Sequence, residues 1–162
     1  MRIGILSDSH DRVEAMAAGM KVLRENGAEM YFHCGDVGGQ RVLDLMAGVK
    51  AVFVWGNTDW DRQALERYAA DLGIECRGDL AELQLEGKTI AMTHGHDHQI
   101  MRRILRGTDH DYLLHGHTHM ARDDRAGRLR VINPGALHRA AKKTVALLDL
   151  ATDELRFLPV NI

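Results

Sequence analysis

Residues 2–11 read RIGILSDSHD, in which an apolar run is followed directly by charged and polar side chains. A short apolar run of this kind is typical of a strand that is buried on both faces of a sheet. The polar residues after it would stand at the carboxyl end of that strand, where ligands bind in α/β sheets. The same arrangement recurs along the chain, so this stretch sets the prediction for the fold.

Hydrophobic periodicity predicts strands and helices that alternate at first, and mostly strands afterwards. We expect strands over these segments: 2–7, 29–33, 51–55, 80–85, 89–93, 111–115, 129–132, 142–150 and 154–159. We expect helices over these segments: 11–26, 40–46, 60–70 and 98–105. Thr58 or Asp59 is expected to cap the third helix. No shift in composition marks a domain boundary, so we expect a single α/β domain over residues 1–162, with two sheets packed face to face and helices outside.

The composition is that of a globular protein, and it excludes several classes. The 162 residues are 45% apolar and 27% charged with a formal net charge of −2, so the chain is not a basic nucleic-acid binder. No apolar run reaches the roughly 18 residues of a membrane span, and the two cysteines form no CxxC pair. A cytoplasmic location is therefore expected. Residues 101–162 carry 11 basic and 7 acidic side chains, a mild indication of an anionic ligand.

Polar side chains follow five of the predicted strands. They occur in these stretches: Asp8-Ser9-His10, His33-Cys34-Gly35-Asp36, Gly56-Asn57-Thr58-Asp59, His94-Gly95-His96 and Gly116-His117-Thr118-His119. Carboxylate, imidazole and amide groups without thiolate suit divalent ions such as Mn²⁺, Fe²⁺ and Zn²⁺. Seven candidate ligands exceed the three or four that one zinc needs, which indicates two ions: Asp8, His10, Asp36, Asn57, His94, His117 and His119.

These residues could also have purely structural roles. Asp8 and Asp36 could be helix caps or turn residues, and Asn57 could be a turn former. A histidine cluster could lie on the surface without a role, although seven of the ten histidines fall between His94 and His119. The five strand ends occurring together favour metal ligation over these alternatives.

The series Asp8-x-His10, Gly35-Asp36, Gly56-Asn57-x-Asp59, His94-Gly95 and Gly116-His117-x-His119 resembles the calcineurin-like metallophosphoesterase family. The short chain and the late Asn133-Pro134-Gly135 resemble its small one-domain bacterial and archaeal phosphodiesterase branch. The resemblance runs in order from residue 8 to about residue 135. It implies a four-layer αββα sandwich and a phosphodiesterase acting on a small phosphoester, in which a metal-bridging hydroxide attacks phosphorus.

The resemblance also implies a division of the ligands between two ions. One ion would be held by Asp8, His10, Asp36 and His119, and the other by Asp36, Asn57, His94 and His117. Manganese is the expected metal, with nickel, cobalt, iron, zinc and magnesium as alternatives. Asp36, Asn57 and His96 are the candidate catalytic residues, where His96 either contacts the substrate or supports a ligand. We expect His33 and His115 to be satisfied core histidines, and His98, His110 and His138 to lie on the surface.

One position departs from the family pattern. Many members carry a histidine where this chain has Thr58, and that histidine is thought to help the leaving oxygen depart. A threonine hydroxyl has no suitable pKa for that role. Protonation of the leaving group is therefore expected to be weak, or to come from His96 or His98.

Other functions remain open at this stage. The same site could hydrolyse phosphomonoesters, and a retromer subunit uses this fold mainly as a protein-binding scaffold. A nuclease acting on duplexes would need a larger basic surface than this chain has, so nucleic acid is not the expected partner. A membrane partner is not expected, and a homodimer is left open.

Overall fold

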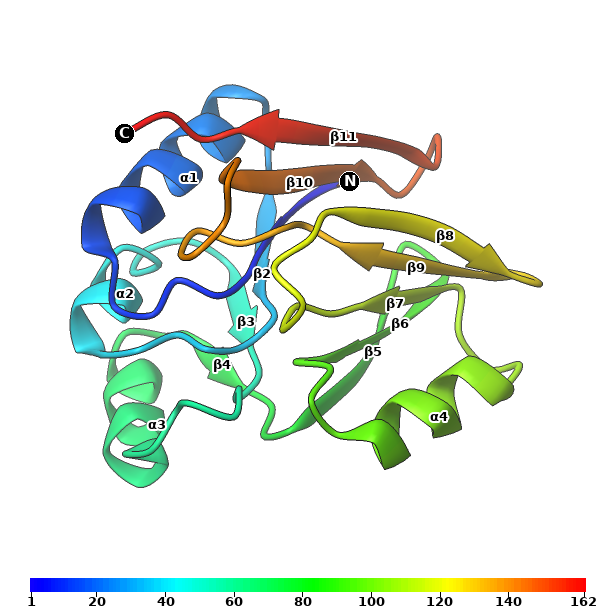
Figure 1. Cartoon of the computed structure of the whole chain (residues 1–162), viewed down its shortest axis with the longest axis horizontal. Helices are drawn as coiled ribbons and strands as arrows, with labels where there is room; N and C mark the ends of the chain where they lie inside the picture. Colours follow the sequence, from blue (N-terminus) through cyan, green and yellow to red (C-terminus); the bar gives the residue numbers. More distant parts are fainter.

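The computed structural model describes residues 1–162 as two mixed β-sheets packed face to face with helices outside (Figure 1). The six-stranded sheet has the order β11 (Glu154–Pro159), β10 (Thr144–Asp149), β1 (Arg2–Leu6), β2 (Met30–His33), β3 (Ala51–Phe53) and β4 (Glu75–Cys76). The five-stranded sheet has the order β5 (Leu80–Leu85), β6 (Lys88–Thr93), β7 (Tyr112–Leu114), β9 (Leu129–Asn133) and β8 (Arg122–Ala126). The predicted αββα sandwich is confirmed.

The central strands of both sheets, such as β1 and β7, are apolar on both faces because each sheet lies between two layers. In β1, Ile3 and Ile5 pack between the sheets, whereas Leu6 packs under the helices on the outer face. In β7, Tyr112 and Leu114 face inward, whereas Leu113 faces the outer helix. These continuous apolar runs are the expected pattern for sheets that are covered on both faces.

Three helices cover the six-stranded sheet and one covers the five-stranded sheet (Figure 1). The helices are α1 (Val13–Glu25), α2 (Gln40–Asp44), α3 (Arg62–Asp71) and α4 (His98–Arg106). The prediction that Thr58 or Asp59 caps α3 is wrong, because α3 begins at Arg62 and has no side-chain cap. The Asp59 carboxylate instead accepts hydrogen bonds from backbone amides near the candidate site. No helix has the length and apolar character that a membrane-crossing segment requires.

Two strands escaped the prediction from sequence. β4 has only two residues, too few to show a period. β8 reads RDDRA and is exposed throughout, so it carries no apolar alternation. It pairs antiparallel with β9 at the edge of its sheet. Charged side chains on an edge strand discourage pairing with other chains.

Arg130, which is buried, joins the two sheets through a partly buried hydrogen-bond network. Its guanidinium, in β9, donates to Asp123 of β8 and to Asp153 in the turn between β10 and β11. The hydroxyl of Tyr112 in β7 donates to the same Asp153 carboxylate at 2.8 Å. Burial alone would raise the pKa of Asp153, but hydrogen bonds from Arg125, Tyr112 and Arg130 outweigh it and hold the pKa at about 2.

We expect Arg130→Met to lower the free energy of unfolding at pH 7 by about 1–3 kcal/mol, because the carboxylates of Asp123 and Asp153 and the Asp153 carbonyl lose their shared donor. In Asp153→Asn, the free energy of unfolding is expected to fall less than in wild type as the pH is lowered. The pKa of Asp153 is depressed on folding, so its stabilisation is present above pH 4 and is lost as the pH falls towards 2. Urea unfolding at pH 7 and pH 3 measures both effects. Asp124→Asn, an exposed change on β8, is the control, and equal acid limbs in Asp153→Asn and wild type would contradict the assignment.

Candidate metal centre

The candidate ligands stand just beyond strands of both sheets. They are Asp8 and His10 after β1, Asp36 after β2, Asn57 after β3, His94 after β6, and His117 and His119 after β7. β1, β2 and β3 are parallel to one another, as are β6 and β7. The carboxyl ends of parallel strands meet at one edge of a sheet, which is why residues distant in sequence arrive together here.

Five of these residues form two overlapping groups. The ligand atoms of Asp8, His10 and His119 all lie within 4.8 Å of one another, as do those of Asp8, Asp36 and His94. Asp36 Oδ2 lies 3.3 Å from Nε2 of both His10 and His94, and Asp8 Oδ1 lies 3.0 Å from Nε2 of His119. Both carboxylates therefore lie between the two groups, so either could be shared between two ions.

The chemistry of these atoms fits divalent ions. Asp8 Oδ1, His10 Nε2 and His94 Nε2 are buried and have no hydrogen-bond partner in the chain. Buried polar atoms without partners are costly, so natural proteins rarely keep them without a use. These same three atoms point into the space between the two groups of ligands. One cation in each group would satisfy all three atoms.

Neighbouring groups hold three of the candidate ligands in place through the polar atom that faces away from the centre. Asp8 Oδ2 accepts hydrogen bonds from the Ser7 hydroxyl at 2.6 Å and the His117 amide at 3.1 Å. Asp36 Oδ1 accepts from the Thr58 amide at 3.0 Å. Nδ1 of His94 donates to the Cys34 carbonyl at 2.8 Å, which leaves Nε2 as its free atom. Metal-binding histidines and carboxylates usually have one polar atom held by the protein in this way, while the other binds the metal.

The electrostatics of the site favour a positive charge between the carboxylates. Burial alone would raise the pKa of Asp36, but the adjacent His94 ring and the hydrogen bond from the Thr58 amide outweigh it and lower the pKa well below its usual range. Burial alone would lower the pKa of His94, but Asp36 and Asp8 raise it. Asp36 is therefore ionised at neutral pH, and the space beside His94 attracts cations.

The backbone of the candidate ligands is strained. Five of the seven candidates have positive φ angles, between 44° and 70°: Asp8, His10, Asp36, His117 and His119. Residues with a side chain seldom adopt this left-handed conformation, and when they do they cluster at functional sites. The strain aims the side chains of two neighbouring sheets into one space. No pattern in the sequence marks these angles.

His117 and His96 border the two groups, and Asn57 lies in the chain between Gly56 and Thr58, which both adjoin Asp36. Asn57 is exposed and its amide makes no hydrogen bond within the chain, so it remains available to an ion. The His117 ring lies 5.1 Å from the His94 ring. His96 is half-buried with its ring 5.5 Å from that of His94, and its Nδ1 is buried without a partner. His98 is exposed at the start of α4.

Two buried polar residues position the ligand loops. The Asp59 carboxylate accepts hydrogen bonds from the amides of Val37, Gly38 and Gly56, which join the loops after β2 and β3. The Asn133 side chain donates to the Gly116 carbonyl at 2.9 Å and to the Thr118 hydroxyl at 3.0 Å. Asp59 and Asn133 therefore set the loops that carry Asp36 and His117.

Several histidines differ from expectation. His33 and His115 are buried as predicted, but neither is fully satisfied, because each has one ring nitrogen without a partner. Burial lowers the pKa of His33 to about 3 and that of His115 to about 4, so both rings are neutral at pH 7. His110 is buried against Glu82 rather than exposed. His138 is half-buried with its ring 5.2 Å from that of His10, so it adjoins the candidate centre.

Comparisons with known proteins find relatives that cover nearly the whole chain. Phosphodiesterase MJ0936 of Methanocaldococcus jannaschii is 26% identical over 161 residues, which cover 96% of this chain and 97% of that protein. The structure of an archaeal phosphodiesterase superposes with a TM-score of 0.91 at 25% identity, covering 99% of this chain and all of that one. A phosphoesterase of E. coli, YfcE, has a TM-score of 0.72 at 19% identity over 99% of this chain and all of its own. Zinc-bound Vps29 of Entamoeba histolytica has a TM-score of 0.65 at 17% identity, over 99% of this chain and all of its own. The last two likenesses concern the fold alone.

Residues 1–153 match the family description of the calcineurin-like phosphoesterase superfamily domain. That match spans every candidate ligand and nearly the whole fold. The chain therefore belongs to the calcineurin-like phosphoesterase superfamily, and it is a metal-dependent phosphoric ester hydrolase.

Proposed function

We propose that this protein is a phosphodiesterase that uses two divalent metal ions to hydrolyse a P–O bond of a small phosphoester. The observation that carries the proposal is the pair of overlapping ligand groups around Asp8 and Asp36, whose free buried atoms face one another. The archaeal phosphodiesterase relative supports the choice of a diester over a monoester.

The ligands divide between two ions in this proposal. Asp8, His10, Asp36 and His119 would hold one ion, and Asp36, Asn57, His94 and His117 would hold the other. Asp36 would be the shared ligand, because its Oδ2 lies 3.3 Å from the Nε2 of both His10 and His94, whereas Asp8 Oδ1 lies 3.9 Å from each. When bound, such ions polarise the phosphoryl oxygens and activate the attacking water, and manganese is the expected metal.

The chain's own residues orient this chemistry. Ser7, Cys34 and Thr58 fix the outer atoms of Asp8, His94 and Asp36, so that the inner atoms stay aimed at the centre. His96 stands beside His94 and His117, and its Nε2, the ring nitrogen that is not buried, can donate to a substrate oxygen. We therefore assign His96 a substrate contact.

The test of the proposal is metal-dependent turnover. Protein stripped with a chelator should hydrolyse bis-p-nitrophenyl phosphate only after Mn²⁺, Ni²⁺, Co²⁺, Mg²⁺ or Zn²⁺ is restored. Asn57→Ala and His94→Ala should each lose this activity, whereas exposed His98→Ala should keep it. Faster turnover of p-nitrophenyl phosphate would indicate a phosphomonoesterase. Metal binding without turnover of either ester would indicate a protein-binding scaffold.

Thr58 leads to a prediction about leaving groups. Its hydroxyl lies 3.5 Å from His10 Nδ1 and its amide binds Asp36, so it supports two ligands rather than supplying a proton. General acid catalysis typically contributes about 10²–10⁴-fold, so diesters with an alkyl leaving group should react at least about 100-fold more slowly than aryl diesters. Thr58→His should raise the alkyl rate by about tenfold or more and leave the aryl rate within a few-fold. Rates are compared over a series of leaving groups with Thr58→Ser as control, and equal wild-type rates for aryl and alkyl diesters would refute the prediction.

A further inference from the structure

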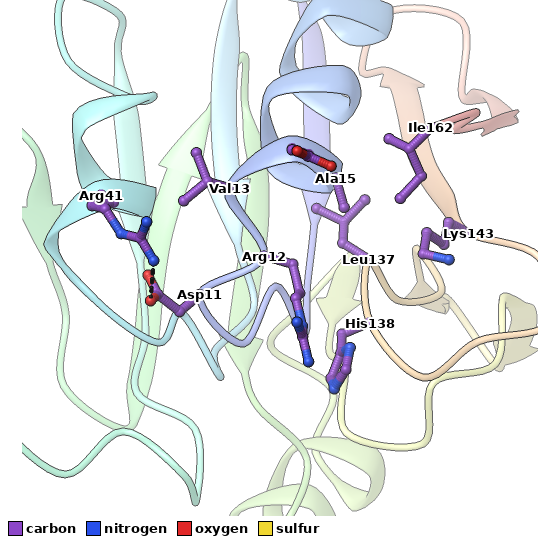
Figure 2. A pocket seen from close by; sticks show the side chains of 10 residues that line it. Asp11, Arg12, Val13, Ala15, Arg41, Leu137, His138, Lys143 and Ile162 are labelled. Carbon is purple, nitrogen blue, oxygen red and sulfur yellow. Dashed lines mark hydrogen bonds and ion pairs between the residues drawn. The ribbon is translucent and has the colours of Figure 1, made fainter.

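A cavity of about 640 Å³ opens beside the candidate metal centre (Figure 2). It lies between the start of α1 and the segment that connects β9 to β10. This volume falls within the range of small-molecule binding sites. The amide of Leu137, in the wall of the cavity, donates to the Ser7 carbonyl at 3.2 Å, so the wall is tied to the segment that carries Asp8.

The cavity and the candidate centre share a boundary. His138 lines the cavity, and its ring lies 5.2 Å from the ring of His10. Asp11, which follows His10 in the chain, also lines the cavity. Figure 2 shows the side chains of Arg12 and His138 lying side by side and pointing in the same direction. A molecule bound at the metal centre could therefore extend past His10 and His138 into this cavity.

Two cations of the cavity have no acidic partner. Arg41 pairs with Asp11 at 2.9 Å, so these two charges cancel locally (Figure 2). Arg12 and Lys143 make no ion pair and no side-chain hydrogen bond within the chain, and Glu14 is the other acidic residue in the lining. The backbone of Lys143 is held by a hydrogen bond from the Val160 amide at 2.9 Å, which fixes the start of its side chain. Free cations at a cavity wall attract an anionic group.

The rest of the lining is apolar. Val13, Ala15, Leu137 and Ile162 supply the hydrophobic part of the wall. An apolar lining with a few cations suits a ligand that has both an apolar body and a compact anion. Phosphate and carboxylate both match the guanidinium of Arg12, which can donate two parallel hydrogen bonds.

We propose that this cavity is a specificity site for one arm of the diester, which carries a second anionic group, a phosphate monoester, on an apolar body. Arg12 and Lys143 bind that phosphate, and Val13, Ala15 and Leu137 contact the body of the arm. The inference rests on the proposed phosphodiesterase function, because the scissile phosphate must lie at the metal centre while the second phosphate lies in the cavity. Arg12 and Lys143 are positioning residues that set which diester is preferred.

Calorimetry on chelator-stripped protein tests the cavity without any metal. The probe is thymidine 3′,5′-bisphosphate in about 0.15 M salt, where distant charges are screened. We expect Arg12→Ala and Lys143→Ala each to weaken binding by about five- to tenfold, because each removes a charged donor. Exposed Arg67→Ala on α3 and Lys142→Ala, the lysine next to Lys143 that lies outside this cavity, should stay within about twofold of wild type. Equal affinities in all variants, or no binding to wild type, would overturn the proposal.

Kinetics on the metal-loaded protein separate this inference from the proposed function. The substrates are the p-nitrophenyl diesters of thymidine 5′-phosphate with and without a 3′-phosphate, which share the same leaving group. The 3′-phosphate should lower KM by about fivefold or more at similar kcat, and Arg12→Ala should abolish that preference. Equal KM values with intact metal-dependent turnover would overturn the cavity assignment and leave the phosphodiesterase standing. Absence of turnover with every metal would overturn the phosphodiesterase, while the calorimetry still decides the cavity.

Discussion

Asp36→Asn is expected to lower kcat/KM for bis-p-nitrophenyl phosphate by about 10³-fold or more and to reduce the bound metal below one equivalent. Asp36 is the ligand shared by both proposed ions, and its Oδ2 lies 3.3 Å from the ligand atoms of His10 and His94. A 10³-fold fall in kcat/KM corresponds to a loss of about 4 kcal/mol of transition-state stabilisation by the metal ions. The asparagine keeps the shape of the side chain and can still accept the Thr58 amide, so the loss would reflect charge rather than a collapsed loop.

Two measurements check the expectation for Asp36. Elemental analysis of dialysed protein counts the metal, and steady-state kinetics at saturating Mn²⁺ measure the turnover. Asp71→Asn, at the exposed end of α3, is the matched control and should behave as wild type. Two full equivalents of metal together with near-normal turnover in Asp36→Asn would refute the assignment of this carboxylate.

Gly56→Ala is expected to have the second-largest effect, lowering the free energy of unfolding by about 3 kcal/mol and abolishing metal binding. A Cβ at residue 56 would lie 2.0 Å from Asp36 Oδ1 and 2.3 Å from the Asp36 backbone nitrogen. The backbone nitrogen cannot move away as a flexible side chain can. The two loops after β2 and β3 would have to separate, and the Asp59 carboxylate that bridges them would lose its amides.

Urea unfolding in the presence of chelator measures the Gly56 effect without any contribution from bound metal. Gly107→Ala is the control because it lies at an exposed helix end, where a Cβ would come no nearer than 3.2 Å to another atom. We expect this control to change the free energy of unfolding by less than about 1 kcal/mol. Wild-type stability and full metal content in Gly56→Ala would show that the loops are not packed as described.

The strands were predictable wherever a run of adjacent apolar residues indicates a buried segment. The buried runs around Ile3, Phe32 and Val52 report a covered sheet because every side chain along them is apolar. β8 could not be found in this way, since its pairing with β9 leaves no trace in the exposed sequence RDDRA. The cap of α3 was mispredicted because the Asp59 carboxylate accepts hydrogen bonds from the nearby Gly56 amide and from the amides of Val37 and Gly38 in a distant loop. No local pattern in the sequence indicates the distant partners.

The order and chemical type of the candidate ligands came from the sequence alone. Each Asp, Asn or His that follows a strand can be recognised from the local sequence around that strand. Tertiary structure decided which atoms meet. It placed Asp36 Oδ2 equally close to His10 and His94, gave five of the ligands positive φ angles, and brought His138 beside His10. It also joined Arg130 to Asp153 across the two sheets. Periodicity extends over a few residues of the chain, whereas these contacts depend on how two sheets and their loops pack over more than a hundred residues.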